Sequence, residues 1–279
     1  MILGDFLVDI VSDGSLRLDG GAMFGVVPRV LWAKLCAVDD LNRIEVALNC
    51  LLVRYKDQII LVDTGAGNKW SEKHRRIYAL SCGKLVESLK QHDIHPEDIT
   101  MVINTHLHFD HAGGNTTLRN GQIVPTFPNA RYIVQRAEYE HACRPHERDR
   151  ASYISDDWEP IKHQLELIEG DCEIIPGLEV FRVPGHNLDT QLVRISSGNL
   201  KLVFFADIIP TSLHLPYAWV MAYDLYPVEL VEQKKRLVPQ AEAESWICIF
   251  EHDPVLPAGR IVKEKDKYKV LEEACLKPA

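Results

Sequence analysis

The stretch that decides the fold is Thr105-His106-Leu107-His108-Phe109-Asp110-His111, which places three imidazoles and one carboxylate within six consecutive positions. Such a density of metal-ligating side chains is costly to hold unless ions bind them. In an extended loop, residues two apart point to the same side, so His106 and His108 can grip one metal ion while Asp110 and His111 turn toward a second. Residues 105–111, called the histidine string below, therefore predict a site for two metal ions.

The histidine string follows a predicted buried strand. The apolar run over residues 99–103 is typical of such a strand, and the spacing of Leu85, Val86 and Leu89 predicts a helix before it. The string thus lies on a loop at the carboxyl end of a strand, where a rigid sheet commonly holds catalytic groups. Further strands are predicted over residues 132–134, 179–183, 202–205 and 246–250, and the last two lead directly into Asp207 and His252.

The N-terminal part of the sequence predicts strands with a structural role. Residues 6–11 alternate apolar and polar side chains and precede Asp13-Gly14, which predicts an edge strand entering a hairpin. Residues 46–53 and 58–62 predict a second antiparallel pair joined by a short polar turn. The second of these strands runs into Asp63-Thr64-Gly65.

Length and charge limit the domain organisation and the partners. The 279 residues contain 46% hydrophobic and 25% charged side chains, which is ordinary for a globular protein with a substantial core. No repeat or linker marks a boundary, so residues 1–279 are expected to form a single domain. The formal charge of -9 makes nucleic acid an unfavourable partner, because binding to it depends on Lys and Arg neutralising phosphates.

The cysteines and the apolar segments bear on location. Seven scattered cysteines without a C-x-x-C pair are typical of a reduced protein and are expected to be free thiols. The sequence starts without a basic region followed by a long apolar run, and no segment approaches the ~18 apolar residues of a membrane span. We therefore expect a cytoplasmic protein with no membrane partner.

The histidine string resembles the H-x-H-x-D-H motif of the metallo-β-lactamase superfamily. The later markers of that superfamily occur in the expected order, as Pro184-Gly185-His186, Phe205-Ala206-Asp207 and Glu251-His252-Asp253. The resemblance covers nearly the whole chain, from about Asn49 onward. It implies an α/β architecture in the form of a four-layer αββα sandwich, the metallo-β-lactamase fold.

The resemblance also implies a ligand set. One metal ion would be held by His106, His108 and His186, and the other by Asp110, His111 and His252, with Asp207 bridging both. Asp63 looks like the carboxylate that supports the ligand loops from behind. An Asp that simply forms a turn before Thr-Gly is the alternative for Asp63.

Other stretches narrow the resemblance. Gly113-Gly114, residues 133–140, residues 168–171 and Ile175-Pro176-Gly177 look like the N-acyl-homoserine lactone lactonases and their relatives, a group that includes phosphotriesterase-like and aryl-ester hydrolases. These lactonases carry a Tyr shortly after the bridging Asp, near the substrate carbonyl. Here Ile208-Ile209-Pro210 follows Asp207, and Tyr217 or Tyr223 is a candidate substitute.

The function predicted on this basis is a dinuclear metal-dependent hydrolase that opens a lactone or cleaves a related ester. Two ions ~3.5 to 4 Å apart can share a water whose pKa falls toward ~7, which gives a hydroxide nucleophile. Zn²⁺ is the expected metal, and Mn²⁺, Fe²⁺ and Co²⁺ suit the same ligands. Asp110 and Asp207 are the predicted catalytic residues, Asp110 as the acceptor of the nucleophile's proton and Asp207 as the bridge.

The sequence leaves several alternatives open. A phosphotriesterase, an aryl-esterase, or a glyoxalase-like thioester hydrolase would use the same fold, and a metal-binding protein without turnover is the alternative outside enzymes. The substrate's apolar part could pack on residues 24–32, Phe109 or residues 215–219, although ordinary core or surface packing is favoured for any one of these residues. His214 is a histidine outside the motif that could reach the pocket, and a plain surface role is the favoured alternative. Because residues 24–32 are unusually apolar for a loop, they suggest a homodimer.

Overall fold

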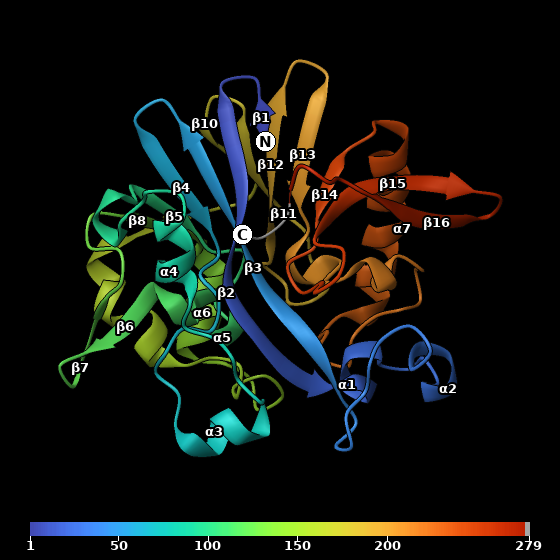
Figure 1. The fold of residues 1–279 in the computed structure, drawn as a ribbon, viewed down its shortest axis with the longest axis horizontal. Helices are drawn as coiled ribbons and strands as arrows, with labels where there is room; N and C mark the ends of the chain where they lie inside the picture. Colours follow the sequence, from blue (N-terminus) through green and yellow to red (C-terminus); the bar gives the residue numbers. More distant parts are fainter. Residues whose placement is uncertain (277–279) are drawn as a thin grey trace. The chain divides into compact units, whose positions relative to one another are not determined.

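The structure is a computed structural model that describes residues 1–276. It divides into two compact units and contains two seven-stranded sheets, one of them mainly in each unit (Figure 1). Unit 1 consists of Met1–Gly14 and Leu48–Cys172, and unit 2 consists of Ser15–Ala47 and Glu173–Leu276. The expectation of one domain over residues 1–279 stays a prediction, and its last three residues lie outside the described part of the chain.

The sheet of unit 1 places the histidine string at the end of a parallel strand. Its strand order is β1-β2-β3-β4-β5-β8-β9, with β1 Ile2–Leu3, β2 Phe6–Asp19, β3 Arg43–Tyr55, β4 Gln58–Val62, β5 Met101–Ile103, β8 Arg131–Gln135 and β9 Leu165–Ile168. β3 and β4 form the predicted hairpin, whereas β4, β5, β8 and β9 run parallel. Val62 pairs with Ile103, so Asp63 and the string leave the sheet at the same edge.

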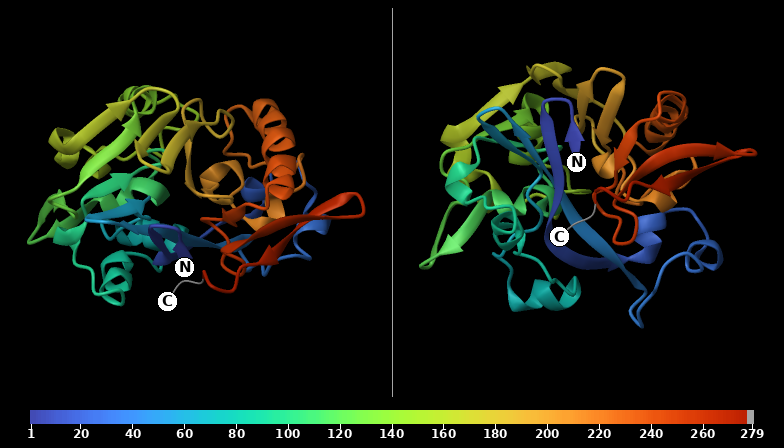
Figure 2. Two further views of the ribbon diagram at one scale, coloured as in Figure 1. Left: turned by 90° about the horizontal axis from the view of Figure 1, so that it is seen from above. Right: turned by 45° about the horizontal axis from the view of Figure 1, so that its top comes forward.

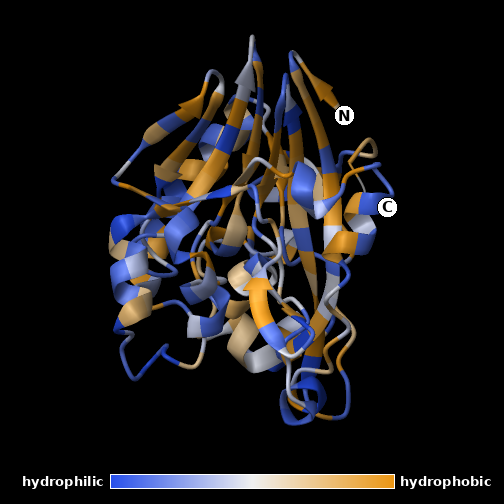
Figure 3. Ribbon diagram, turned by 90° about the vertical axis from the view of Figure 1, so that its left-hand side faces the viewer, coloured by the Kyte–Doolittle hydropathy of each residue, from blue (hydrophilic) through white to orange (hydrophobic). Residues whose placement is uncertain are grey.

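The helices of unit 1 are short, and the apolar side of α4 packs on the strands. The helices are α3 Glu72–Ile77, α4 Leu85–Lys90, α5 Phe109–Ala112 and α6 Arg136–Cys143, with 3-10 turns at η1 Pro96–Asp98, η2 Gly113–Asn115, η3 Ser155–Asp157 and η4 Glu159–Gln164 and a small hairpin of β6 Thr116–Arg119 and β7 Gln122–Pro125. Leu85 and Leu89 of α4 are buried in one cluster with Leu61 and Val102. In Figure 3 the strands carry most of the hydrophobic colour, while the helices are mixed or hydrophilic.

Unit 2 contains the second sheet and the longest helix. Its strand order is β10-β11-β12-β13-β14-β15-β16, with β10 Cys172–Ile175, β11 Leu178–Arg182, β12 Gln191–Ser197, β13 Leu200–Phe204, β14 Ile247–Ile249, β15 Ala258–Glu264 and β16 Lys267–Glu272. Its helices are α1 Gly20–Phe24, α2 Arg29–Trp32 and α7 Pro227–Ala243, with 3-10 turns at η5 Ala206–Ile208 and η6 Ser212–His214. α7 buries Leu230, Leu237 and Val238 and packs beside β15 (Figure 2).

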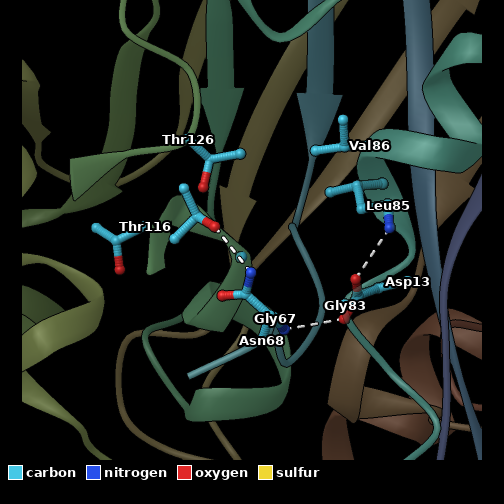
Figure 4. Close-up of a pocket in the computed structure, with 10 residues that line it drawn as sticks. Asp13, Gly67, Asn68, Gly83, Leu85, Val86, Thr116 and Thr126 are labelled. Carbon is cyan, nitrogen blue, oxygen red and sulfur yellow. Dashed lines mark hydrogen bonds between the residues drawn. The ribbon is translucent and has the colours of Figure 1, made fainter. Parts of the chain in front are cut away.

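The predicted turn at Asp13-Gly14 is wrong, because β2 continues through both residues to Asp19. The side chain of Asp13 accepts hydrogen bonds from the backbone N–H groups of Gly67 at 2.9 Å and Leu85 at 3.0 Å (Figure 4). Gly14 has a φ of 113°, and a Cβ there would lie 1.9 Å from the carbonyl oxygen of Ser81. The Asp-Gly pair therefore serves the close approach of another segment and does not reverse the chain.

Two further predictions can be compared with the structure. All seven cysteines are free thiols, as the sequence predicts. Among residues 1–276, no helix is both long enough and apolar enough to cross a membrane.

Candidate metal centre

In unit 1 the histidine string brings its four candidate ligands close together within six consecutive residues. The ring centroids of His106 and His108 lie 4.4 Å apart, and those of His106 and His111 lie 4.0 Å apart. His108 has an extended backbone and α5 begins at the next residue. The change from extended to helical chain explains why the string presents two groups, because His106 and His108 precede it and Asp110 and His111 follow it.

Asp63 supports the histidine string from the neighbouring strand. One of its oxygens accepts a hydrogen bond from the backbone N–H of Thr105 at 2.8 Å, and the other lies 2.6 Å from the Thr105 hydroxyl and 3.0 Å from Nδ1 of His111. Asp63 is fully buried and has a φ of 56°, a left-handed conformation that Asp tolerates better than most residues. With Nδ1 engaged, His111 directs Nε2 away from Asp63, as a metal-ligating histidine with a carboxylate partner does.

A second carboxylate supports the middle of the string. Glu138 on α6 accepts a hydrogen bond from the backbone N–H of Leu107 at 2.8 Å and another from the hydroxyl of Tyr153 at 3.1 Å. The ring of Tyr153 meets that of His108 edge-on, with centroids 4.7 Å apart. Sequence reasoning assigned Glu138 no role, although it lies in a stretch typical of the lactonases.

In unit 2 the three candidate ligands come from three segments and meet at Asp207. One oxygen of Asp207 lies 3.1 Å from Nε2 of His186, and the other oxygen lies 3.1 Å from Nε2 of His252. All three residues are buried. The parallel pairing of β13 with β14 brings Asp207 and His252 to one sheet edge, because Phe204 pairs with Ile249. A carboxylate that gives one oxygen to each of two imidazoles has the geometry expected of a bridge.

Each of these two histidines has its other ring nitrogen held. Nδ1 of His186 lies 2.9 Å from a carboxylate oxygen of Asp224, and Nδ1 of His252 lies 2.8 Å from the carbonyl oxygen of Ala47. A partner on Nδ1 fixes the ring and leaves Nε2 for a ligand. Asp224 is a residue that sequence reasoning missed, because an isolated Asp between Tyr223 and Leu225 carries no spacing signal.

The ring nitrogens of His214 are engaged by partners other than the candidate ligands, and the surface position that the sequence also suggested is wrong. It is buried, its Nε2 lies 2.8 Å from the carbonyl oxygen of Met23, and its Nδ1 lies 2.7 Å from the hydroxyl of Thr211. Its ring stacks on that of Phe24 with an angle of 1° between the planes. Burial lowers the pKa of His214 to about 4, so the ring is neutral and pins α1 within unit 2.

Aromatic side chains from two of the predicted apolar segments, residues 24–32 and 215–219, pack against other side chains of unit 2. Phe24 and Trp32 are buried, and their rings stack at 5.2 Å, so they belong to the packing of unit 2. Tyr217, a candidate substitute for the lactonase Tyr, packs on Tyr268 with ring centroids 6.3 Å apart.

The residues present fit divalent metal ions. Buried imidazoles and carboxylates are costly unless paired or ligating, and these types together suit Zn²⁺ and related transition metals. The string in unit 1 and the Asp207 group in unit 2 each gather such side chains, and in each the supporting contacts occupy Nδ1 of a histidine. The arrangement within each unit is that of ligands prepared for metal.

The sequence matches the metallo-beta-lactamase superfamily over residues 44–252. This match covers more than half of the chain, and the chain belongs to that superfamily. It includes all seven candidate ligands: His106, His108, Asp110, His111, His186, Asp207 and His252. The predicted family and fold class are therefore confirmed.

Individual relatives agree with this assignment. The chain is similar to the N-acyl homoserine lactonase AiiA of Bacillus thuringiensis subsp. kurstaki, with 33% identity over 175 residues, or 61% of this chain and 62% of that protein. It thus matches less than two thirds of the length of that relative. A crystal structure of a probable metal-dependent hydrolase from Staphylococcus aureus matches 98% of this chain and 99% of that chain, with 31% identity and a TM-score of 0.90.

A third comparison concerns a ligand-bound structure. An N-acyl homoserine lactone hydrolase, solved with its product N-hexanoyl-L-homoserine bound at the catalytic metal centre, matches with 25% identity and a TM-score of 0.68. The match covers 88% of this chain and 93% of that one.

Proposed function

We propose that this protein is a metal-dependent hydrolase of the lactonase type, which binds two divalent ions and opens lactones or cleaves related esters. The observation that carries the proposal is the placement of Asp207, whose two oxygens each lie 3.1 Å from Nε2 of a different buried histidine. The names of the relatives support the choice of lactones among the esters.

The proposed ligand set is the one that the superfamily motif implies. His106, His108 and His186 would hold one ion, and Asp110, His111 and His252 would hold the other, with Asp207 shared. The contacts of Asp63 and Asp224 support this assignment, because each carboxylate occupies Nδ1 of one proposed ligand. The donor types favour Zn²⁺, with Mn²⁺, Fe²⁺ and Co²⁺ also suited.

The chemistry follows from these groups. Two bound ions would supply a nucleophile derived from water at neutral pH and polarise the carbonyl or phosphoryl oxygen of the substrate. Asp110 would accept a proton from the attacking water with the carboxylate oxygen that it does not use as a ligand, and would return it to the leaving oxygen. Asp63 and Asp224 would keep His111 and His186 oriented throughout the reaction.

A cavity in unit 1 adjoins the histidine string and suits the apolar part of a substrate. It has a volume of about 300 Å³ and is lined by Lys69, Trp70, Ser71, His74, Tyr78, Phe109, Ala151 and Ile154. The rings of Trp70 and Phe109 meet edge-on with centroids 5.0 Å apart. Because Phe109 lies between His108 and Asp110, an apolar substituent held here would extend directly from the reacting centre. The proposed apolar wall therefore includes Phe109.

The predicted location and assembly remain proposals of their own. A homodimer through residues 24–32 would cover Val26 and Val30, which are 83% and 71% exposed in unit 2. Sedimentation that shows only monomer at micromolar concentration would remove this proposal. A cytoplasmic location would be tested by fractionating cells that express the chain.

The test of the function combines metal analysis with a substrate panel. The purified chain is examined by mass spectrometry for metal content and assayed on an acyl-homoserine lactone, an aryl ester, a phosphotriester and a thioester. We expect about two ions per chain and turnover of the lactone or the aryl ester. In His108→Ala we expect loss of bound metal and a fall in kcat/KM of about 100-fold or more.

The matched control is His141→Ala, which removes a histidine of unit 1 that pairs with Asp149 at 2.7 Å and lies outside the proposed ligand set. It should keep its metal and its activity. Turnover of the phosphotriester or thioester alone would replace the lactone with that substrate. A metal-loaded chain that hydrolyses none of the four would favour a metal-binding protein without turnover, and a metal-free chain would overturn the whole proposal.

A further inference from the structure

Asp224 uses both of its carboxylate oxygens inside unit 2. One lies 2.9 Å from Nδ1 of His186, and the other accepts a hydrogen bond from the backbone N–H of Met221 at 2.6 Å. Asp224 is only 5% exposed, and burial raises the pKa of its carboxyl above the ordinary value. A carboxylate is costly to bury, so its cost must be offset by these two contacts.

The backbone fixes the distance between the two residues independently. Leu225 N–H donates to the carbonyl of His186 at 2.8 Å, and Tyr226 N–H donates to the carbonyl of Gly185 at 2.9 Å. The segment that carries His186 and the segment that carries Asp224 are therefore hydrogen-bonded to each other. This pairing holds Asp224 within reach of Nδ1 of His186.

A buried lysine holds the loop before Asp224. The Nζ of Lys234, in the middle of α7, donates to the carbonyl of Pro216 at 2.9 Å and to that of Trp219 at 2.8 Å. Lys234 is fully buried, and burial lowers its pKa to about 7 although the charge of Asp224 opposes this shift. Burying a lysine costs more free energy than burying an apolar residue at the same position of α7. The two hydrogen bonds to the loop carbonyls offset this cost and tie the loop to α7.

These contacts form one chain of support from α7 to a proposed ligand. Lys234 fixes residues 216–219, Met221 and Asp224 close the loop that follows, and Asp224 meets His186. With Asp224 accepting from Nδ1–H, the imidazole of His186 is held in the tautomer whose Nε2 carries the lone pair. That Nε2 faces the oxygen of Asp207 at 3.1 Å.

We propose that Asp224 is a positioning residue that orients His186 for metal binding, and that Lys234 keeps the loop bearing Asp224 in place. The proposal rests on the proposed function insofar as His186 is a metal ligand. It goes beyond that function, because neither Asp224 nor Lys234 belongs to the ligand set. A purely structural role for Asp224 would cost stability without altering the metal.

The central test replaces Asp224 by Asn in the full chain and reads the metal directly. An Asn can accept from His186 or from Met221 with its single oxygen, and its NH₂ group then faces a donor on the other side. We expect the affinity for one Co²⁺ per chain to fall 10- to 100-fold and the visible spectrum of the Co²⁺-loaded protein to change. Asp224→Glu, which keeps the charge, should recover part of the lost affinity.

The matched control is Asp149→Asn. Asp149 is also buried and lies 2.7 Å from a histidine nitrogen, but His141 is no proposed ligand. Its Co²⁺ affinity and spectrum should equal those of the unsubstituted chain. If Asp224→Asn likewise binds two Co²⁺ ions with unchanged affinity and spectrum, the positioning role is overturned while the proposed function stands.

A second variant tests the part played by Lys234. Lys234→Met keeps the length of the buried stem and removes both hydrogen bonds, so Co²⁺ affinity should fall by up to about 10-fold, less than for Asp224→Asn. Lys235→Met is the control, because Lys235 is exposed and pairs with Glu232 at 2.7 Å. Equal Co²⁺ affinity in the two lysine variants would remove Lys234 from the proposal. An unsubstituted chain that binds no Co²⁺ would overturn both this inference and the proposed function.

Discussion

The two groups of proposed ligands are held in opposite ways. In unit 1 they belong to one stretch of seven residues, and Asp63 and Glu138 hold the backbone of that stretch. In unit 2 they come from three separate segments, and each histidine has a partner of its own, the Asp224 carboxylate for His186 and the Ala47 carbonyl for His252.

This difference has a physical consequence. A support shared by a whole loop places several ligands at once, so its loss should disturb all of them. A support that serves one ligand should disturb that ligand alone. The comparison therefore predicts broad effects from substitutions behind the histidine string and narrow effects from substitutions behind His186.

The largest effect is expected from Asp63→Asn. Three donors, the Thr105 N–H, the Thr105 hydroxyl and Nδ1–H of His111, now share one acceptor oxygen, whereas Asn still tolerates the left-handed backbone. The free energy of unfolding should fall by about 4 kcal/mol. Both metal ions should bind more weakly, by about 10- to 100-fold. Urea denaturation and metal titration measure the two effects.

Asp13→Asn controls for the loss of a buried carboxylate in unit 1. Asp13 accepts backbone N–H bonds from Gly67 and Leu85 and supports no proposed ligand. It should lose stability and keep its metal affinity. If Asp63→Asn weakened only one of the two ions, the shared support in unit 1 would be disproved.

The same difference explains how much the sequence could predict. The histidine string is local, so its residues and their order alone indicated a metal site. The apolar runs over residues 58–62 and 99–103 likewise predicted the strands that the structure has at Gln58–Val62 and Met101–Ile103. The supports could not be found this way. Glu138 lies 31 positions from Leu107, and Asp224 lies 38 positions from His186, so no spacing rule connects them.

Two errors have a related cause. Asp13-Gly14 has the composition of a turn. In the fold, however, the Asp13 carboxylate accepts hydrogen bonds from Gly67 and Leu85, and the missing side chain of Gly14 leaves room for the backbone of Ser81. His214 looked like a loop histidine near Asp207, yet the stacking of Phe24 on its ring buries it. In both cases a long-range contact overrode a local preference.

The next effect concerns pH and unit 2 alone. The pKa of His214 in the folded chain is about 4, against an ordinary 6.5, so between these values the unfolded chain binds a proton that the folded chain does not. Stability is therefore fully present above about 6.5 and decreases as the pH falls toward 4, by at most about 3 kcal/mol. The charged groups near the ring are Lys234, Asp207 and Asp253.

The measurement compares the metal-free chain with His214→Asn by urea denaturation at several pH values. The variant cannot titrate at this position, so it should be less stable at pH 7 and the difference should shrink toward pH 4. A difference that stays constant across this range would show that His214 is protonated equally in both states.

A smaller effect is expected from Gly185→Ala, directly before His186. Gly185 has a φ of 149°, and a Cβ there would lie 2.8 Å from Cα of Leu230 on α7. The free energy of unfolding should fall by about 2 kcal/mol. The collision should displace the backbone next to His186 and no other proposed ligand. One ion should therefore bind more weakly and the other should not. Gly198→Ala is the control for the backbone strain of a positive φ. Gly198 has a φ of 57°, but a Cβ there would meet open space and collide with nothing.

The smallest effect is expected from Glu138→Gln. The amide oxygen of Gln can still accept from the N–H of Leu107, and the Tyr153 hydroxyl can reorient, so the free energy of unfolding should fall by only about 1 kcal/mol. Glu140→Gln, two positions on in α6 and exposed, should stay within about 0.5 kcal/mol of the unsubstituted chain. If Glu138→Gln instead lost as much stability and metal as Asp63→Asn, the charge of Glu138 would be what holds the string. The loop would then depend on two carboxylates equally, and unit 1 would resemble unit 2 in giving different ligands separate supports.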